Sequence, residues 1–455
     1  MSGTIAATPK VADKQTRERL SGVVEYVLAE AKKSGASGAE AAANVDQGLA
    51  VSVRLSEVET VEHTRDKGIG VTVYFGNRTG SASTTDFSPE ALRETVRAAC
   101  TIAKYTAEDD CAGLADPERL ARDIPDLDLH HPWNPGVDRA IELARTAETT
   151  ARQFDTRIAN SEGASLSTHE GLEVYGNTHG FLGTVATTRH SLSVSVIAQG
   201  ESGMQRDYWY TVARDARGLE SPESVGREAA RRSLRRLDSH KLATRECPVL
   251  YEAPVASSLL SHFVGAVRGS SLYRHASFLL DHLGKPVFAD FVHIQEQPHL
   301  KGAAGSAAFD NEGVATRPRD LVRGGILQGY VLDSYSARKL KMTTTGNAGG
   351  VHNLSIAPGP DNFDLADLLR HMHTGLLVTE LIGFGVNTVT GDYSRGAAGF
   401  WVENGEIQYP VEEITVAGNL RDIFRRIRAV GNDVDTRGNI RSGSILIENM
   451  TVAGN

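Results

Sequence analysis

The chain has 455 residues, more than one ordinary core accommodates, so two or three domains are expected. With 40% hydrophobic and 23% charged residues, the composition is typical of a globular protein, and the net charge of -9 opposes general binding to the phosphates of nucleic acid. No apolar run approaches the ~20 residues of a membrane span and no amino-terminal targeting pattern occurs, so we expect a cytoplasmic protein without a membrane partner.

The first part of the chain predicts a small α+β unit. Residues 1–13 are expected to form a flexible tail, and residues 14–106 to form the unit itself. A helical repeat of apolar residues from Leu20 to Ala31 is followed by strands with alternating apolar residues. Ser88-Pro89-Glu90 then predicts a second helix, because serine caps a helix, proline suits its first position and an acid favours its first turn.

The same order of elements recurs further along the chain. Residues 107–135 are acidic and rich in turn-forming residues, and we interpret them as a linker. Residues 136–240 predict a second α+β unit, in which Ser221-Pro222-Glu223 again begins the last helix. The order alone leaves a structural repeat and a coincidence both open. Four arginines of this helix are expected on a solvated or salt-bridged surface: Arg231, Arg232, Arg235 and Arg236.

Residues 247–455 predict a β-rich, mostly antiparallel domain. One helix is expected near 254–268, where apolar residues recur at helical spacing. Gly324-Gly325 and Asn404-Gly405 each lie between apolar runs, and Asn-Gly favours the tight turn of a β-hairpin. The expected fold class is therefore α+β, with an α/β-layered first half, in which the two similar units are either a repeat or a coincidence, and a β-rich second half.

The usual motifs of a zinc protease are absent. Neither HExxH nor H-E-x-x-x-H occurs, although such a site needs two imidazoles on one helical face and a carboxylate base. His169-Glu170 lies in a strand-like context and is interpreted as a surface pair. His130-His131 falls in the linker, and His371-Met372-His373 in a predicted helix, where residues two apart point to different sides. None of these pairs is interpreted as a metal site.

Motifs for nucleophilic catalysis or phosphate binding are absent as well. GxSxG does not occur, and no glycine-rich phosphate loop joins a strand to a helix. Residues 391–396 hold an acid, a phenol, a hydroxyl and a guanidinium between two glycines, which indicates either a functional loop or a turn with an Asp392–Arg395 pair. The chain has three irregularly spaced cysteines, so no disulfide framework is expected: Cys100, Cys111 and Cys247.

The second half resembles the PmbA (TldE) branch of the TldD/PmbA family. The resemblance is carried by four strings: SYSARKL at 334–340, TGNAGGVHN at 345–353, TGDYSRGAAGFWVENG at 390–405 and VGND at 430–433. It extends from about Cys247 to the carboxyl end nearly without gaps, whereas the first half fits the layout of the family more loosely.

The family implies two similar subunits, of which only the TldD-type subunit carries H-E-x-x-x-H and a metal-binding cysteine near its carboxyl end. The resemblance places the motif positions here at Ser261, His262 and Ala266, and the cysteine position at Ser442. Alanine has no donor atom, and a neutral hydroxyl is a poor substitute for imidazole or thiolate. We therefore expect no catalytic residue and no metal in this chain, with zinc or iron in a TldD-type partner.

The implied function is that of the PmbA (TldE) subunit of a metalloprotease whose two subunits enclose a cavity for unfolded peptides. Extended peptides often bind at sheet edges through their main chain, which suits low specificity. The same residues could line this cavity, form the subunit interface or serve only the fold: Asn347, His352, Asn353, Asp392, Tyr393, Ser394 and Arg395. A homodimer is an alternative state when the partner is absent.

Two other functions stay open at this point. The chain could be a stand-alone metallopeptidase whose site is assembled in three dimensions from distant residues. It could also be a non-enzymatic, protein-binding regulator of the DNA gyrase modulator type, because the acidic charge opposes direct DNA binding but not a protein partner.

Overall fold

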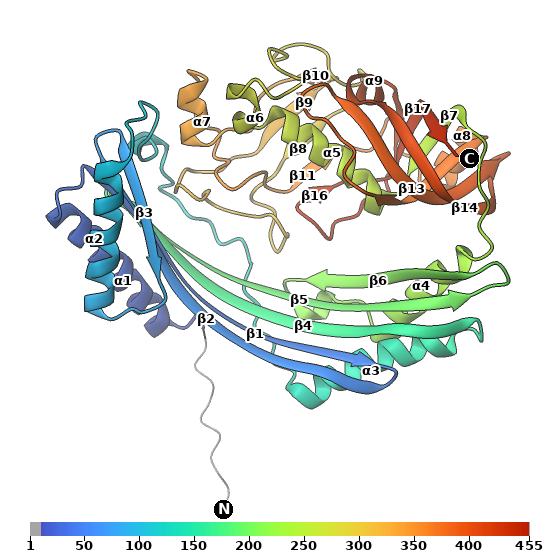
Figure 1. Ribbon diagram of the computed structural model, residues 1–455, viewed down its shortest axis with the longest axis horizontal. Coiled ribbons are helices and arrows are strands. Elements are labelled where there is room, and N and C mark those ends of the chain that lie inside the picture. The colour runs from blue at the N-terminus through green and yellow to red at the C-terminus, as the bar shows by residue number, and fades with distance from the viewer. Residues whose placement is uncertain (1–10, 455) are drawn as a thin grey trace, which may run out of the picture.

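A curved six-stranded sheet forms the first half of the protein and lies opposite a β-rich second half in the computed structural model, which describes residues 11–454 (Figure 1). Most of the expected tail lies outside these residues. Of its last three residues, Val11 is buried against the first core, and the Asp13 side chain accepts a hydrogen bond from the Thr16 N–H as the amino-terminal cap of the first helix. The fold is a mixed α+β structure, as predicted.

The first unit contains two helices and three strands that follow one another as hairpins. Its elements are α1 (Lys14–Lys33), β1 (Gly38–Arg54), β2 (Glu57–Phe75), β3 (Arg78–Thr84) and α2 (Pro89–Tyr105). Ser88 caps α2 as predicted, since its hydroxyl accepts a hydrogen bond from the Ala91 N–H. Both helices pack one apolar face against this end of the sheet, where Leu20, Val24 and Val96 are buried.

The second unit repeats this order of elements and continues the same sheet. It consists of α3 (Val137–Gln153), β4 (Ile158–Asn177), β5 (Leu182–Gln199), β6 (Met204–Ala213) and α4 (Pro222–Arg235). The strand order is β3-β2-β1-β4-β5-β6, so the two units meet where β1 and β4 pair antiparallel, for example Gly48 with His169. The two units thus share one sheet, which the sequence alone did not indicate.

The outer edge of this sheet is free over part of β2. The strand pairs with β1 along almost its whole length, but β3 covers only Ile69–Phe75 on its other side. The uncovered residues from Glu57 to Lys67 are exposed, and many are charged.

The segment between the two units is packed against the second half rather than free. It contains a short helical turn, η1 (Pro117–Arg119), and its Leu120 and Leu127 join a small core with Phe309 and Val314. Arg338 donates hydrogen bonds to the carbonyl groups of three residues of the segment: Cys111, Gly113 and Leu114. Residues interpreted from sequence as a linker therefore form part of the contact between the two halves.

The second half contains two sheets and several short helices. One sheet has the strand order β14-β13-β12-β7-β17-β15, with β14 also paired to β17, and the other has the order β10-β9-β8-β11-β16. Its elements are β7 (Arg245–Tyr251), α5 (Ala253–Val267), α6 (Gly269–Tyr273), β8 (Ile294–Glu296), β9 (Arg319–Arg323), β10 (Ile326–Leu327), α7 (Ser334–Lys339), β11 (Leu354–Ile356), α8 (Leu365–Met372), β12 (Gly375–Ile382), β13 (Asp392–Glu403), β14 (Glu406–Asn419), α9 (Leu420–Arg425), β15 (Ile427–Val430), β16 (Ile440–Arg441) and β17 (Ile445–Ala453).

Most strand pairs of this half are antiparallel, as expected, and only β7–β12 and β11–β16 are parallel. Both predicted hairpins are present. Asn404 and Gly405 join β13 to β14 with φ values of 53° and 78°, which are the positive angles that a type I′ turn requires. Within the described part of the chain, no helix is long and apolar enough to cross a membrane.

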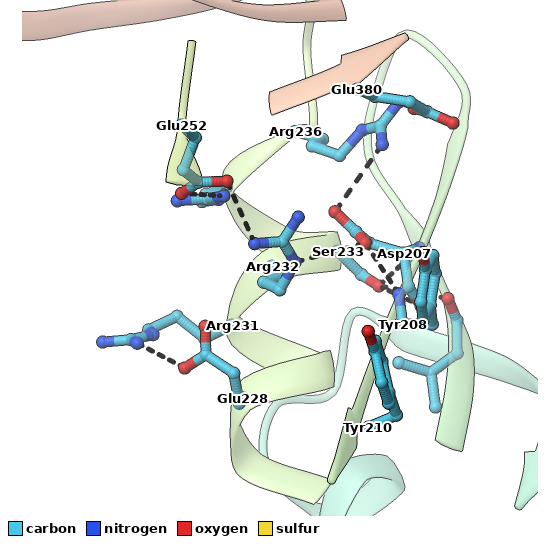
Figure 2. A network of polar contacts seen from close by, with 12 residues as sticks. Asp207, Tyr208, Tyr210, Glu228, Arg231, Arg232, Ser233, Arg236, Glu252 and Glu380 are labelled. Atoms are coloured by element: carbon cyan, nitrogen blue, oxygen red, sulfur yellow. Dashed lines mark hydrogen bonds and ion pairs between the residues drawn. The ribbon is translucent and has the colours of Figure 1, made fainter. Parts of the chain in front are cut away.

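A buried ionic network joins the two halves (Figure 2). The Arg232 guanidinium on α4 lies 3.3 Å from the Asp207 carboxylate of β6 and 3.3 Å from the carboxylate of Glu252, which precedes α5. Arg236 lies 3.6 Å from Asp207 and 2.5 Å from Glu380 on β12. The prediction of a solvated or salt-bridged surface was therefore wrong for Arg232, which is buried, and for Arg236, whose side chain is 14% exposed, because partners from distant parts of the chain enclose them. Arg231 is exposed, as predicted.

We expect Arg232→Met to lower the free energy of unfolding by about 3 kcal/mol, because the buried carboxylates of Asp207 and Glu252 each lose one of their two arginine partners. Arg231→Met is the matched control on the same helix, since Arg231 is 69% exposed and pairs with Glu228. It should cost less than about 1 kcal/mol. Urea unfolding measures both changes, and equal effects would contradict the structural role of the network.

Candidate functional site

Helix α5 carries the three positions at which the resemblance places a metal motif. Pro254 occupies its first turn, and the following sequence is apolar enough for the helix to lie in the main core of the second half. Leu259, Leu260, Phe263 and Ala266 are buried there. The helix packs against β16, and Ser442 follows that strand directly. The fold thus brings the end of β16, where Ser442 occupies the cysteine position, to the helix that carries Ser261, His262 and Ala266.

The residues at these positions do not fit a metal ion. Ser261 is exposed, and its hydroxyl donates to the Ser257 carbonyl at 3.1 Å. Ala266 is buried and has no donor atom. Ser442 is buried, and its hydroxyl donates to the Gly443 carbonyl at 2.7 Å. Three of the four positions therefore offer neither an imidazole nor a thiolate nor a carboxylate, which are the side chains that bind zinc or iron.

His262 is the remaining candidate ligand, and its surroundings favour an uncharged core residue. Its ring meets the Tyr393 ring edge to face at 5.9 Å, and its Nε2 atom is buried without a hydrogen-bond partner among the described residues. Burial, with a further contribution from the Arg395 guanidinium, lowers the pKa of His262 below its usual value.

The segment 391–396 forms the beginning of strand β13 beside α5. Tyr393 is buried and its hydroxyl accepts a hydrogen bond from the Tyr251 hydroxyl at 3.3 Å. Asp392 and Ser394 are exposed on the other face of the strand, and Arg395 is half-buried. Asp392 accepts hydrogen bonds from the Thr390 hydroxyl at 2.6 Å and the Asn419 amide at 3.2 Å.

The Asp392–Arg395 pair considered from sequence does not form. The Arg395 guanidinium donates instead to the Ile382 carbonyl at 3.4 Å. Two separate sequence candidates, His262 and the 391–396 segment, are nevertheless neighbours in the fold. Tyr251, the partner of Tyr393, was not predicted from sequence, because it lies on β7 more than a hundred residues away.

The other candidate stretch, residues 345–353, belongs to an internal hydrogen-bond network around the five-stranded sheet. The buried Asn347 amide donates to Glu296 at 2.7 Å and accepts from Arg319 at 2.8 Å. The buried Asn353 side chain accepts from the Gly305 N–H at 2.9 Å and donates to the Ser306 hydroxyl at 2.7 Å. In this structure these two side chains therefore support the fold and have no free surface for a peptide.

His352 and the other histidines of interest also have protein partners. The His352 ring lies 3.0 Å from the Gly346 carbonyl. His130 lies 2.8 Å from Glu170, which is buried. Of the expected surface pair His169-Glu170, His169 is therefore exposed and Glu170 is not. Over residues 11–454 no group of three or more His, Cys, Asp or Glu side chains is arranged to hold a metal ion.

Comparison with known proteins relates the whole chain to one family. Sequence profiles described as PmbA/TldA metallopeptidase domain 1, central domain and C-terminal domain match residues 39–103, 130–237 and 244–454. A protein of Escherichia coli O157:H7 named metalloprotease PmbA is 54% identical over 92% of this chain and 92% of its own length.

Two further comparisons extend this result. A protein of Haemophilus influenzae named metalloprotease TldD homolog is 24% identical, over 81% of this chain and 80% of its own length. A crystal structure from Bacteroides thetaiotaomicron, described as a candidate modulator of DNA gyrase, superposes with a TM-score of 0.91 at 29% identity, over 97% of this chain and 100% of that one.

The environment of His262 leads to a prediction about pH. A histidine whose pKa is lowered by folding takes up its proton more readily in the unfolded chain, so acid favours unfolding as the pH falls below about 6.5. His262→Phe keeps an aromatic ring beside Tyr393 and cannot be protonated. We expect the free energy of unfolding to decrease less for the variant than for the wild type between neutral pH and pH about 5.5. Urea unfolding at both pH values measures this, and parallel losses would refute it.

Proposed function

Because this chain belongs to the PmbA/TldD metallopeptidase family, we propose that it is the metal-free subunit of a two-subunit peptidase that degrades or trims unfolded peptides. The observation that carries the proposal is the set of side chains at Ser261, His262, Ala266 and Ser442, which lacks the donors of a metal site. In the proposed complex a TldD-type subunit holds zinc or iron and performs the hydrolysis, and this chain is catalytically inert on its own.

The second subunit has a physical role in such a complex. A closed chamber needs a second wall, and a wall made of strands can bind an extended peptide through its main chain. We assign peptide contact to the exposed or half-buried residues at the beginning of β13, namely Asp392, Ser394 and Arg395. Asn347, His352 and Asn353 hold the backbone around the five-stranded sheet in place, and Tyr393 supports β13 from the core.

A surface of the second half supports contact with another subunit. The end of β12 and its connection to β13 expose three large apolar side chains, Ile382, Phe384 and Val389, and Phe384 is 99% exposed. We assign this connection to the interface with the TldD-type subunit, and to self-association when that subunit is absent. The thiols Cys100, Cys111 and Cys247 are all free, which supports location in the reducing cytoplasm.

Two other functions would give different results. A stand-alone metallopeptidase would need a metal site within this chain, and the described residues contain no suitable group. The description of the Bacteroides protein favours a gyrase regulator, which would bind gyrase and have no need of a TldD-type subunit.

Purification with and without a TldD-type subunit tests the proposal. We expect less than about 0.1 metal ion per chain for this protein alone and no cleavage of an unfolded peptide, because three ligand positions lack donors. The complex should contain metal and cleave the peptide until a chelator is added. Stoichiometric metal and chelator-sensitive cleavage by this chain alone would refute the inert role, and capture of gyrase without any TldD-type protein would favour the regulator.

The interface assignment has its own test. We expect Phe384→Asp to weaken association with the TldD-type subunit by at least about tenfold, because a large apolar anchor is replaced by a charge. Tyr105→Asp is the matched control, since Tyr105 is 89% exposed on α2 in the first half. Analytical ultracentrifugation measures both, and equal affinities for the two variants would remove Phe384 from the interface.

A further inference from the structure

A cavity of about 530 Å³ lies where the six-stranded sheet meets the second half, and cations dominate its lining. Residues from β5, from the end of β6 and from the segment between the two units form one side, and residues 300–304 and 436–441 form the other. Two carboxylates, Asp128 and Asp215, stand against six cationic side chains: Arg189, Arg214, Arg217, Lys301, Arg437 and Arg441. This positive excess occurs in a chain whose net charge is -9.

Both carboxylates of the cavity already have cationic or imidazole partners. Asp215 lies 2.5 Å from the Arg217 guanidinium and 3.6 Å from the His131 ring. Asp128 lies 3.2 Å from the same ring. Arg437 is likewise neutralised, because it pairs with Asp435 at 2.7 Å and lies over the Trp209 ring. Asp215 and Arg437 are therefore paired within the walls, and Asp128, whose partner is an imidazole, is the one carboxylate of the lining left against the remaining cations.

Four cations of the cavity have no carboxylate partner among the described residues: Arg189, Arg214, Lys301 and Arg441. Arg214 donates to the carbonyls of Thr188 and Ala304 at 3.0 and 2.9 Å, so it ties the sheet to the opposite wall. The Nε atom of Arg441 is buried without a hydrogen-bond partner. Arg441 itself is only partly buried, but an unpaired donor atom out of contact with water is costly, and an anion in the cavity would relieve that cost.

Asn353, at the end of the 345–353 stretch, and Leu354, which follows it, hold the wall that carries Arg441 in place. Leu354 pairs with Ile440, which immediately precedes Arg441. Asn353 binds Gly305 and Ser306 at the end of the loop that carries Lys301. Figure 1 shows β16 on the side of the second half that faces the sheet. The cations are therefore held in position by strands and by the loop of residues 300–304, whose end is hydrogen-bonded to Asn353.

We propose that this cavity binds the carboxylate of a peptide and thereby anchors substrate on the wall of the chamber. Arginine presents a planar fork that matches a carboxylate with two parallel hydrogen bonds, and the volume suits a short stretch of peptide. A carboxylate carries a single negative charge, so Asp128 and Asp215 repel it less than they repel phosphate. The inference rests on the proposed function. The carboxylate comes either from the end of the peptide or from an acidic side chain.

Three labelled peptides of one length distinguish these sources. The first has neutral side chains and a free terminal carboxylate, the second has acidic side chains and an amidated end, and the third has neutral side chains and an amidated end. We expect the first or the second to bind the full-length chain at least about tenfold more tightly than the third, with an affinity that falls as salt is added. Fluorescence anisotropy measures binding without any cleavage.

Substitutions locate the binding. Arg441→Gln and Arg189→Gln should each weaken the preferred peptide about tenfold, because each removes one charge-assisted contact. Arg206→Gln is the charge-matched control on β6, where Arg206 pairs with Glu162 away from the cavity, and it should change affinity less than about twofold. The Arg189 side chain makes no hydrogen bond or ion pair within residues 11–454, and its backbone pairing in β5 does not depend on it, so Arg189→Gln keeps the test valid if Arg441→Gln does not fold.

Three results would each overturn the assignment. All three peptides could bind equally, or all three substitutions could weaken binding equally. Inorganic phosphate could also displace the labelled peptide at a lower concentration than any unlabelled peptide does. These outcomes leave the proposed function intact if the complex with the TldD-type subunit still cleaves peptide. Metal-dependent cleavage by this chain alone would overturn the proposed function whatever the anisotropy shows.

Discussion

Ion pairs buried between the two halves set the relation of one half to the other. Arg232 and Arg236 each contact the first-half residue Asp207 and a carboxylate of the second half, Glu252 or Glu380. A buried ion pair is favourable only when its charged groups are in close contact, whereas two apolar surfaces can shift against each other at little cost. We therefore interpret the network as the interaction that favours one arrangement of the two halves. The cationic cavity takes its walls from the same two halves, and its shape therefore depends on this joint.

The local elements of the fold could be predicted because short-range interactions specify them. Ser88 and the Ser221 of the second unit cap helices through their own side chains, and Asn404-Gly405 meets the angles of a tight hairpin. The single sheet could not be predicted, since β1 and β4 pair across more than a hundred residues and antiparallel pairing leaves no local trace. The arginine run of α4 was misjudged for the same reason, because its partners are remote.

The candidate site divides in a similar way. The positions Ser261, His262, Ala266 and Ser442 could be named from the family resemblance, and the structure adds how their atoms are occupied. The neighbourhood of His262 and Tyr393 requires the fold, as does the cavity, whose cations come from four separate stretches of chain and form no pattern in sequence. Patterns find sites built on one element, while sites built from several elements need coordinates.

The uncovered half of β2 has a consequence for the solubility of the protein. An unpaired strand edge can recruit a strand from another molecule and begin aggregation. Between Glu57 and Lys67 the exposed side chains include both signs of charge, so an incoming strand would have to desolvate them and meet like charges. The long hairpin can therefore extend beyond β3 without turning the molecule into a template for fibres.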